Sequence, residues 1–133
     1  MDIKSNFPID VKITDNVKMF VGGCHCQSIR WQAKAQLKDN KAKVIKCNCS
    51  FCYMKQNICV IINSKDFTLI KGCEMLTTYK FSTKIAEHKF CKICGVQSFY
   101  HPRSHPNSIG LNIHTIDNFC EFKYDIVEFD GVN

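Results

Sequence analysis

The sequence predicts a small all-β domain built from short antiparallel strands, and three observations support this prediction. Short runs rich in β-branched and aromatic residues recur along the chain, which is the pattern of half-buried strands. Turn signals such as Gly22-Gly23 separate these runs. Helical periodicity is scarce, because only a short stretch after Cys49 and the region of Asp117 allow a turn or two of helix.

The predicted strands follow one another within one domain. With 133 residues, 45% of them hydrophobic, the chain can build a single modest core. Because no Gly/Ser-rich or Pro-rich linker and no repeat divides it, we expect one domain over residues 17–133, preceded by a loosely attached leader over residues 1–16. In chain order, the expected strands are 17–21, 28–33, 58–62, 67–70, 76–81, 86–90, 96–100, 109–113 and 122–129.

The chain carries a positive charge that comes mainly from lysine. Its formal net charge is +6, from 18 basic and 12 acidic residues, and only Arg30 and Arg103 are arginines. This composition gives weak support to contact with nucleic acid or chromatin. A lysine-rich stretch could face an anionic partner, but we favour the alternative interpretation as a solvated loop; its lysines are Lys34, Lys38, Lys41, Lys43 and Lys46.

Nothing in the sequence predicts a membrane partner. The longest apolar runs, such as residues 58–62, are too short to span a bilayer. The first residues lack the basic segment and apolar stretch of a signal peptide, so we expect an intracellular protein, cytoplasmic or nuclear. In such a reducing compartment, closely spaced cysteines favour metal or redox chemistry over a disulfide framework.

Seven of the ten cysteines fall into three tight clusters, and this arrangement carries most of the functional information. Thiolates one or two residues apart on a turn can bind one soft metal ion, which is the logic of zinc sites. A thiol oxidoreductase is disfavoured, since no βαβ pattern surrounds the CxxC motifs. The clusters are Cys24 and Cys26, then Cys47, Cys49 and Cys52, and finally Cys91 and Cys94.

The count of seven thiols suggests two zinc ions of unequal character. Tetrahedral structural zinc takes four protein ligands, whereas a three-ligand zinc keeps a position open for water or substrate. One metal ion bound by both the first and the last cluster would cross-link distant strands and close a long loop. The middle cluster could then form an open site by itself. Spacing alone also permits the first and middle clusters to pair, or a binuclear cluster to form.

Taken together, the three motifs resemble the glutathione-dependent formaldehyde-activating enzyme family. The residues that carry the resemblance are Gly22-Gly23-Cys24-His25-Cys26, Cys47-Asn48-Cys49-Ser50-Phe51-Cys52 and His88-Lys89-Phe90-Cys91-Lys92-Ile93-Cys94-Gly95. The stretch over residues 90–104 looks like the eukaryotic branch of the family, which is typified by centromere protein V. The chain departs from the pattern at Gln27, where the family usually has glycine, and at Gln56, near another common glycine position.

The resemblance implies a β-rich fold, two zinc ions and a carbon–sulfur lyase activity. The implied structural zinc ligands are Cys24, Cys26, Cys91 and Cys94, and the implied catalytic zinc ligands are Cys47, Cys49 and Cys52. The implied reaction is the reversible condensation of formaldehyde with glutathione to S-hydroxymethylglutathione. An open zinc suits this chemistry, because it can lower the pKa of a bound thiol or polarise an aldehyde.

Two cationic side chains are candidates for contacts with the carboxylates of glutathione. Arg103 stands between Pro102 and Ser104 on a predicted turn, and Lys55 follows the middle cysteine cluster. The alternative to an enzyme is a catalytically silent, zinc-stabilised binding module that uses the same surface for protein or chromatin contacts. The other three cysteines stand alone, and Cys59 in particular is expected to be a small buried apolar residue.

Overall fold

Two β-sheets make up most of the residues that the computed structural model describes, which are 17–37, 41–80, 87–102, 107–117 and 123–129. The mainly β fold class is therefore confirmed. The strands are β1 (Val17–Gly23), β2 (Arg30–Gln36), β3 (Lys41–Cys47), β4 (Ile58–Asn63), β5 (Phe67–Lys71), β6 (Leu76–Tyr79), β7 (Glu87–Cys91), β8 (Phe99–His101), β9 (Ser108–Asn112) and β10 (Lys123–Phe129).

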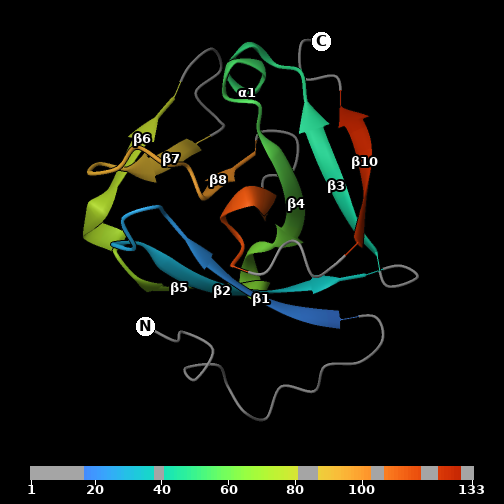
Figure 1. The fold of residues 1–133 in the computed structure, drawn as a ribbon, viewed down its shortest axis with the longest axis horizontal. Coiled ribbons are helices and arrows are strands. Elements are labelled where there is room, and N and C mark those ends of the chain that lie inside the picture. Colours follow the sequence, from blue (N-terminus) through green and yellow to red (C-terminus); the bar gives the residue numbers. More distant parts are fainter. Residues whose placement is uncertain (1–16, 38–40, 81–86, 103–106, 118–122, 130–133) are drawn as a thin grey trace.

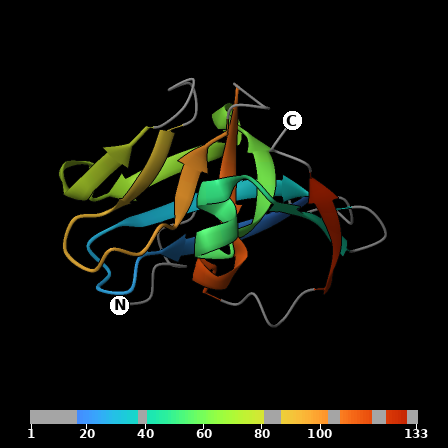
Figure 2. The same cartoon turned by 90° about the horizontal axis from the view of Figure 1, so that it is seen from above.

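The smaller sheet has the strand order β1-β2-β5, and the larger has the order β10-β3-β4-β9-β8-β7-β6. Every described pair of neighbours is antiparallel except β10 and β3, which run parallel. The prediction of antiparallel strands is thus correct for all of these pairs but one. The two ends of the larger sheet, β6 and β10, lie on opposite sides of the molecule (Figures 1 and 2).

Aromatic side chains join the two sheets in a shared core. Phe67 of β5 packs against Phe99 of β8 with ring centroids 4.7 Å apart, and Trp31 of β2 lies 5.9 Å from Phe67. Trp31 is fully buried, and its indole nitrogen donates a hydrogen bond of 2.6 Å to Ser98 Oγ. Gly22 lets β1 approach this indole, since a Cβ there would lie 2.6 Å from the ring.

The lysine-rich stretch is a strand in part, and its interpretation as a solvated loop is wrong for residues 41–47. These residues form β3, which hydrogen-bonds to β4 on one side and β10 on the other. Val44 is fully buried at its centre, while Lys41 is exposed. Backbone pairing on both edges stabilises β3 although three of its seven residues are lysines, so the hydrophobic pattern alone underestimates it.

In the part of the chain that the structure describes, helical structure is confined to short segments. Helix α1 (Ser50–Lys55) confirms the expected turns after Cys49, and it lies at the end of the molecule opposite β1, β2 and β5 (Figure 1). Among the described residues, no helix has the length and apolar character needed to cross a membrane. The remaining helical segments are the 3₁₀ turns η2 (Ser64–Asp66), η3 (Cys73–Met75) and η4 (Ile113–Thr115), the last of which directly precedes the region of Asp117.

The strand predicted at residues 96–100 is too long at its start, because β8 begins only at Phe99. The preceding residues instead close the cysteine-containing loop: the Cys91 backbone N–H donates to the Val96 carbonyl oxygen at 3.1 Å. Segments of the predicted strands at residues 81, 86 and 122 lie outside the described residues.

Candidate metal centres

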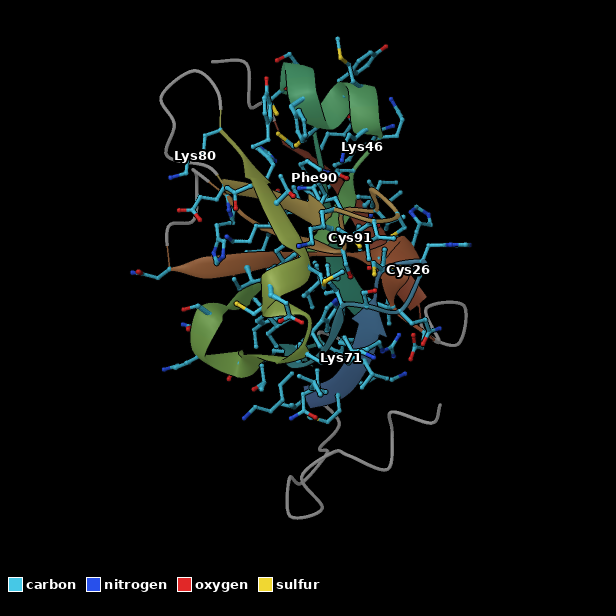
Figure 3. The ribbon with its side chains drawn as sticks, turned by 90° about the vertical axis from the view of Figure 1, so that its left-hand side faces the viewer. Cys26, Lys46, Lys71, Lys80, Phe90 and Cys91 are labelled. Atoms are coloured by element: carbon cyan, nitrogen blue, oxygen red, sulfur yellow. The ribbon has the colours of Figure 1, made fainter. Side chains whose placement is uncertain are left out.

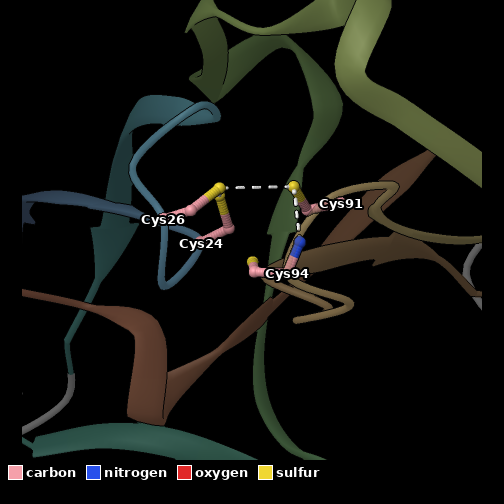
Figure 4. A group of neighbouring side chains, drawn as sticks. All are labelled: Cys24, Cys26, Cys91 and Cys94. Carbon is pink, nitrogen blue, oxygen red and sulfur yellow. Dashed lines mark hydrogen bonds between the residues drawn. The ribbon is translucent and has the colours of Figure 1, made fainter.

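Four cysteines from two distant loops meet at one point. Cys24 and Cys26 lie in the turn between β1 and β2, Cys91 is the last residue of β7, and Cys94 follows in the next turn. Their Sγ atoms all lie within 4.8 Å of one another. Cys26 Sγ is 3.6 Å from both Cys24 Sγ and Cys91 Sγ (Figure 4). This cluster therefore joins the smaller sheet to the larger one.

The spacing of these sulfur atoms suits a tetrahedral metal ion. With Zn–S bonds of about 2.3 Å, the sulfurs of a tetrahedral site lie about 3.8 Å apart. The measured separations of 3.6 Å match this edge length and far exceed a disulfide bond. None of the nine cysteines in the described residues forms a disulfide. We conclude that this four-cysteine cluster could hold a metal ion.

Backbone amides already point at the sulfurs of the four-cysteine cluster. Ile29 N–H donates to Cys24 Sγ at 3.3 Å, and the N–H groups of Ile93 and Cys94 donate to Cys91 Sγ at 3.4 and 3.5 Å. Such donors stabilise sulfur in the thiolate form that a metal requires. The Ser28 hydroxyl, 3.2 Å away, lowers the pKa of Cys26 to about 6.

A second group of thiols lies at the junction of β3 and α1. Cys47 ends β3, Cys49 is the N-cap of α1, and Cys52 lies within the helix, with all three Sγ atoms within 4.8 Å of one another. Cys49 N–H donates to Cys47 Sγ at 3.5 Å, and Cys52 N–H donates to Cys49 Sγ at 3.4 Å. No fourth histidine, cysteine or carboxylate joins the group among the residues that the structure describes.

The three-cysteine cluster requires a cation if its thiols are to ionise together. Cys52 is buried, and its hydrogen bond with Cys47, together with burial, raises the pKa of the Cys52 thiol. Three thiolates this close repel one another unless positive charge lies between them. The donor set therefore suits a metal ion, and three sulfur ligands leave a tetrahedral ion with one position for another ligand.

Lys55, which the sequence predicts as a substrate contact, lies on the same helix as Cys52. Its ammonium group stands 5.3 Å from the ring centroids of both Phe51 and Phe90, so two cation–π contacts hold it. Phe51 in turn stacks on Tyr79 at 5.2 Å. Figure 3 shows α1 at the top, with Phe90 below it and Cys26 and Cys91 lower still. Strand β7 thus extends from the surroundings of α1 to the four-cysteine cluster.

A buried polar network beside Cys52 was not anticipated from the sequence. Asn57 Nδ2 lies 4.0 Å from Cys52 Sγ and donates a hydrogen bond of 3.1 Å to Gln97 Oε1. Gln97 Nε2 lies 3.4 Å from His88 Nδ1. Asn57, His88 and Gln97 are all deeply buried, with exposed fractions of 6%, 2% and 4%.

The other candidate residues lie partly outside the described part of the chain. Arg103, the second predicted substrate contact, falls outside it, as does Cys120. Cys59 is buried as expected, and its sulfur lies 3.4 Å from the hydroxyl of the buried Tyr100. Cys73 is exposed in η3.

Comparison with known proteins places these clusters in a family. The family model described as glutathione-dependent formaldehyde-activating enzyme matches residues 19–129. The chain belongs to this family. A Rhodobacter sphaeroides protein of known crystal structure has a similar fold, with a TM-score of 0.67 and 32% sequence identity. The similarity covers 74% of this chain and 88% of the Rhodobacter protein.

The two departures from the family's glycine pattern coincide with unusual backbone angles. Gln27 and Gln56 have φ values of 68° and 55°, and they are the non-glycine residues with positive φ in the described part of the chain. Gln27 directly follows Cys26, and Gln56 caps the C-terminus of α1 in the left-handed conformation. Both glutamines therefore hold a conformation that glycine adopts without steric strain.

We predict that Gln27→Gly and Gln56→Gly each stabilise the metal-loaded protein by roughly 0.5–1 kcal/mol. The left-handed conformation costs an L-residue about 1–2 kcal/mol, and added freedom of glycine in the unfolded chain offsets about 0.4–1 kcal/mol of that gain. Gln56→Gly should gain less, because the Gln56 side chain donates to the Tyr53 carbonyl oxygen. Urea denaturation of the loaded proteins measures the difference.

Gln36→Gly is the matched control, since Gln36 is exposed in the extended strand β2. Glycine in a strand is expected to lower stability. Equal destabilisation by all three substitutions would show that the left-handed positions carry no strain.

Proposed function

We propose that this protein is a zinc-dependent carbon–sulfur lyase-like enzyme acting on adducts of formaldehyde with glutathione or a related thiol. Its family membership supports the reaction class. The observation that carries the proposal is the three-cysteine cluster, a set of thiols with no fourth histidine, cysteine or carboxylate partner among the described residues. An ion held by Cys47, Cys49 and Cys52 would retain a position for the substrate.

In this proposal the two clusters have different roles. Cys24, Cys26, Cys91 and Cys94 hold a structural zinc that ties the two sheets together, which is supported by their four-thiol donor set. Cys47, Cys49 and Cys52 hold the catalytic zinc. When bound there, zinc would supply Lewis acidity and lower the pKa of a coordinated thiol.

The reaction forms one carbon–sulfur bond and moves one proton. The thiol sulfur attacks the carbonyl carbon of formaldehyde, the C=O π electrons pass to oxygen, and the thiol proton ends on that oxygen as a hydroxymethyl group. The reverse reaction breaks the same C–S bond. Because the thiol and aldehyde combine without a redox partner, a site that orients the thiol and stabilises its anion is sufficient.

Lys55 is the described residue best suited to attract a carboxylate of the thiol substrate. The rings of Phe51 and Phe90 hold its ammonium group, and within the described residues no carboxylate forms an ion pair with it. By contrast, Lys34 pairs with Asp66, and both Lys80 and Lys89 pair with Glu87. Arg103 remains part of the proposal as a second carboxylate contact.

The proposal also covers the domain bounds, the branch of the family and the cellular compartment. We also propose the division into a leader over residues 1–16 and a domain from residue 17, which is supported by the start of the family match at residue 19. The similarity of residues 90–104 to the eukaryotic branch, typified by centromere protein V, supports placing the chain in that branch. Cysteines that bind metal have to stay reduced, so we propose an intracellular location, either cytoplasmic or nuclear, where the compartment is reducing.

The metal assignment predicts two zinc ions per chain and unequal effects of removing their ligands. Cys91→Ser should largely unfold the domain, because structural zinc contributes on the order of 10 kcal/mol in small zinc domains. Cys52→Ser should leave a folded protein with one zinc. Elemental analysis and thermal melts of freshly purified proteins measure both. The reverse ranking in the melts would mean that the structural and catalytic labels are exchanged.

The substrate assignment predicts that glutathione perturbs the metal of the three-cysteine cluster. In cobalt-substituted protein, millimolar glutathione should change the thiolate-to-metal absorption, because an added sulfur ligand alters the coordination. The change should disappear in Cys49→Ser, and exchange of formaldehyde with its glutathione adduct should exceed the uncatalysed rate. Absence of any spectral change would contradict the enzyme proposal and favour the silent binding module.

Removing the charge of Lys55 should weaken glutathione binding. We expect Lys55→Gln to raise the Kd of glutathione about threefold, the effect of a surface charge pair worth roughly 0.2–1 kcal/mol. Lys65→Gln is the matched control, because Lys65 is an exposed lysine in η2, at the opposite end of β4 from α1. Equal weakening by both variants in cobalt titrations would attribute the effect to overall charge and exclude a specific contact.

A further inference from the structure

Three buried amide and imidazole side chains lie beside the three-cysteine cluster, although none belongs to either group of thiols. Asn57 lies between α1 and β4, His88 is in β7, and Gln97 lies in the loop before β8. Burying polar groups is unfavourable unless hydrogen bonds compensate for the lost water. Each donor in this network therefore has to face an acceptor, and the direction of the hydrogen bonds can be deduced from the groups at the two ends of the network.

The hydrogen bonds of the network run in one direction. Asn57 Nδ2 faces Cys52 Sγ at 4.0 Å, which is the orientation that a metal-bound thiolate would require, because a thiolate can only accept. The same nitrogen also donates to Gln97 Oε1 at 3.1 Å. The nitrogen of the Gln97 amide then faces His88 Nδ1 at 3.4 Å, so Nδ1 accepts and the imidazole proton lies on Nε2.

The surroundings of His88 keep this orientation fixed. The imidazole lies between two rings, with centroid distances of 4.3 Å to Phe51 and 5.4 Å to Tyr100, and it is nearly parallel to Tyr100. Burial, together with the charge of Lys55, lowers the pKa of His88 to about 4. His88 is therefore neutral under physiological conditions and presents a stable acceptor to Gln97.

Gln97 connects this network to the loop that carries Cys91 and Cys94. The carbonyl oxygen of Val96, the residue before Gln97, accepts a hydrogen bond from Cys91 N–H. Gly95 N–H in turn donates to the Cys91 carbonyl oxygen at 2.8 Å. The backbone carbonyl oxygen of Gln97 accepts a hydrogen bond of 3.0 Å from Asn112 Nδ2. The backbone of Gln97 is thus held next to the loop of the four-cysteine cluster.

We propose that Asn57 is a positioning residue for the metal ligand Cys52, oriented by Gln97 and His88, and that Gln97 links the two cysteine clusters. This inference rests on the proposed metal in the three-cysteine cluster. Partners that hydrogen-bond to metal ligands fix the orientation of those ligands and change metal affinity about 10–100-fold when they are removed. The network thereby makes Cys52 a prearranged ligand before the metal enters.

The test measures zinc release from the loaded full-length protein to a coloured chelator. The phase belonging to the three-cysteine cluster is identified by its absence in Cys52→Ser. Gln97→Met preserves side-chain length but removes both hydrogen bonds, and it should accelerate that phase about tenfold. The thiolate-to-cobalt absorption of the same cluster should also shift. Asn57→Ala, which removes the donor directly, provides the same test if Gln97→Met does not fold.

The matched control is Gln32→Met, since Gln32 is a partly buried glutamine of β2 whose Oε1 atom has no hydrogen-bond partner among the described residues. It should leave release and absorption unchanged. If wild-type protein holds two metals and Gln97→Met behaves like wild type, or if both glutamine variants change release equally, the positioning role is overturned. If wild-type protein holds only one metal, in the four-cysteine cluster, the proposed function fails as well.

Discussion

The convergence of Cys24 and Cys26 with Cys91 and Cys94 is the constraint on which the arrangement of the two sheets depends. The first pair lies in the turn between two strands of the smaller sheet, and the second pair lies at the end of a strand of the larger sheet. The contact between Cys26 and Cys91 spans 65 residues of sequence, so forming it restricts a long loop. Four thiols at this spacing require a cation to ionise together, so a metal ion bound there would couple metal binding to the packing of the two sheets.

Other contacts between the sheets are arranged around this point. The buried Arg30, on β2, donates two hydrogen bonds to the carboxylate of Asp117, which follows η4. Trp31, the next residue of β2, donates to Ser98 close to the loop of Cys94. Two consecutive residues of β2 thus donate hydrogen bonds to two segments that lie outside the smaller sheet. Such contacts supplement the modest core of a chain of this size.

The sequence predicted the fold class and the local cysteine clusters because both depend on short-range patterns. Strand β3 was missed because pairing with two neighbouring strands stabilises it. In addition, lysines on both sides of the buried Val44 obscure the apolar pattern of this strand. Asn57 and Gln97 were missed for a different reason. They are separated by 40 residues, and their importance comes only from burial beside Cys52. Gln27 and Gln56 were noticed as departures, but their left-handed backbone became evident only in the structure.

The two clusters differ in how much of the fold depends on them, and this difference supports separate roles. Cys47, Cys49 and Cys52 lie close together in the sequence, all at the junction of one strand and one short helix. A change of ligand at such a local site disturbs few contacts, whereas opening the four-cysteine cluster would part segments that belong to two different sheets. Ligand exchange would therefore disturb the fold less at the three-cysteine cluster than at the four-cysteine cluster. This asymmetry is the structural reason for proposing the open metal position at Cys47, Cys49 and Cys52.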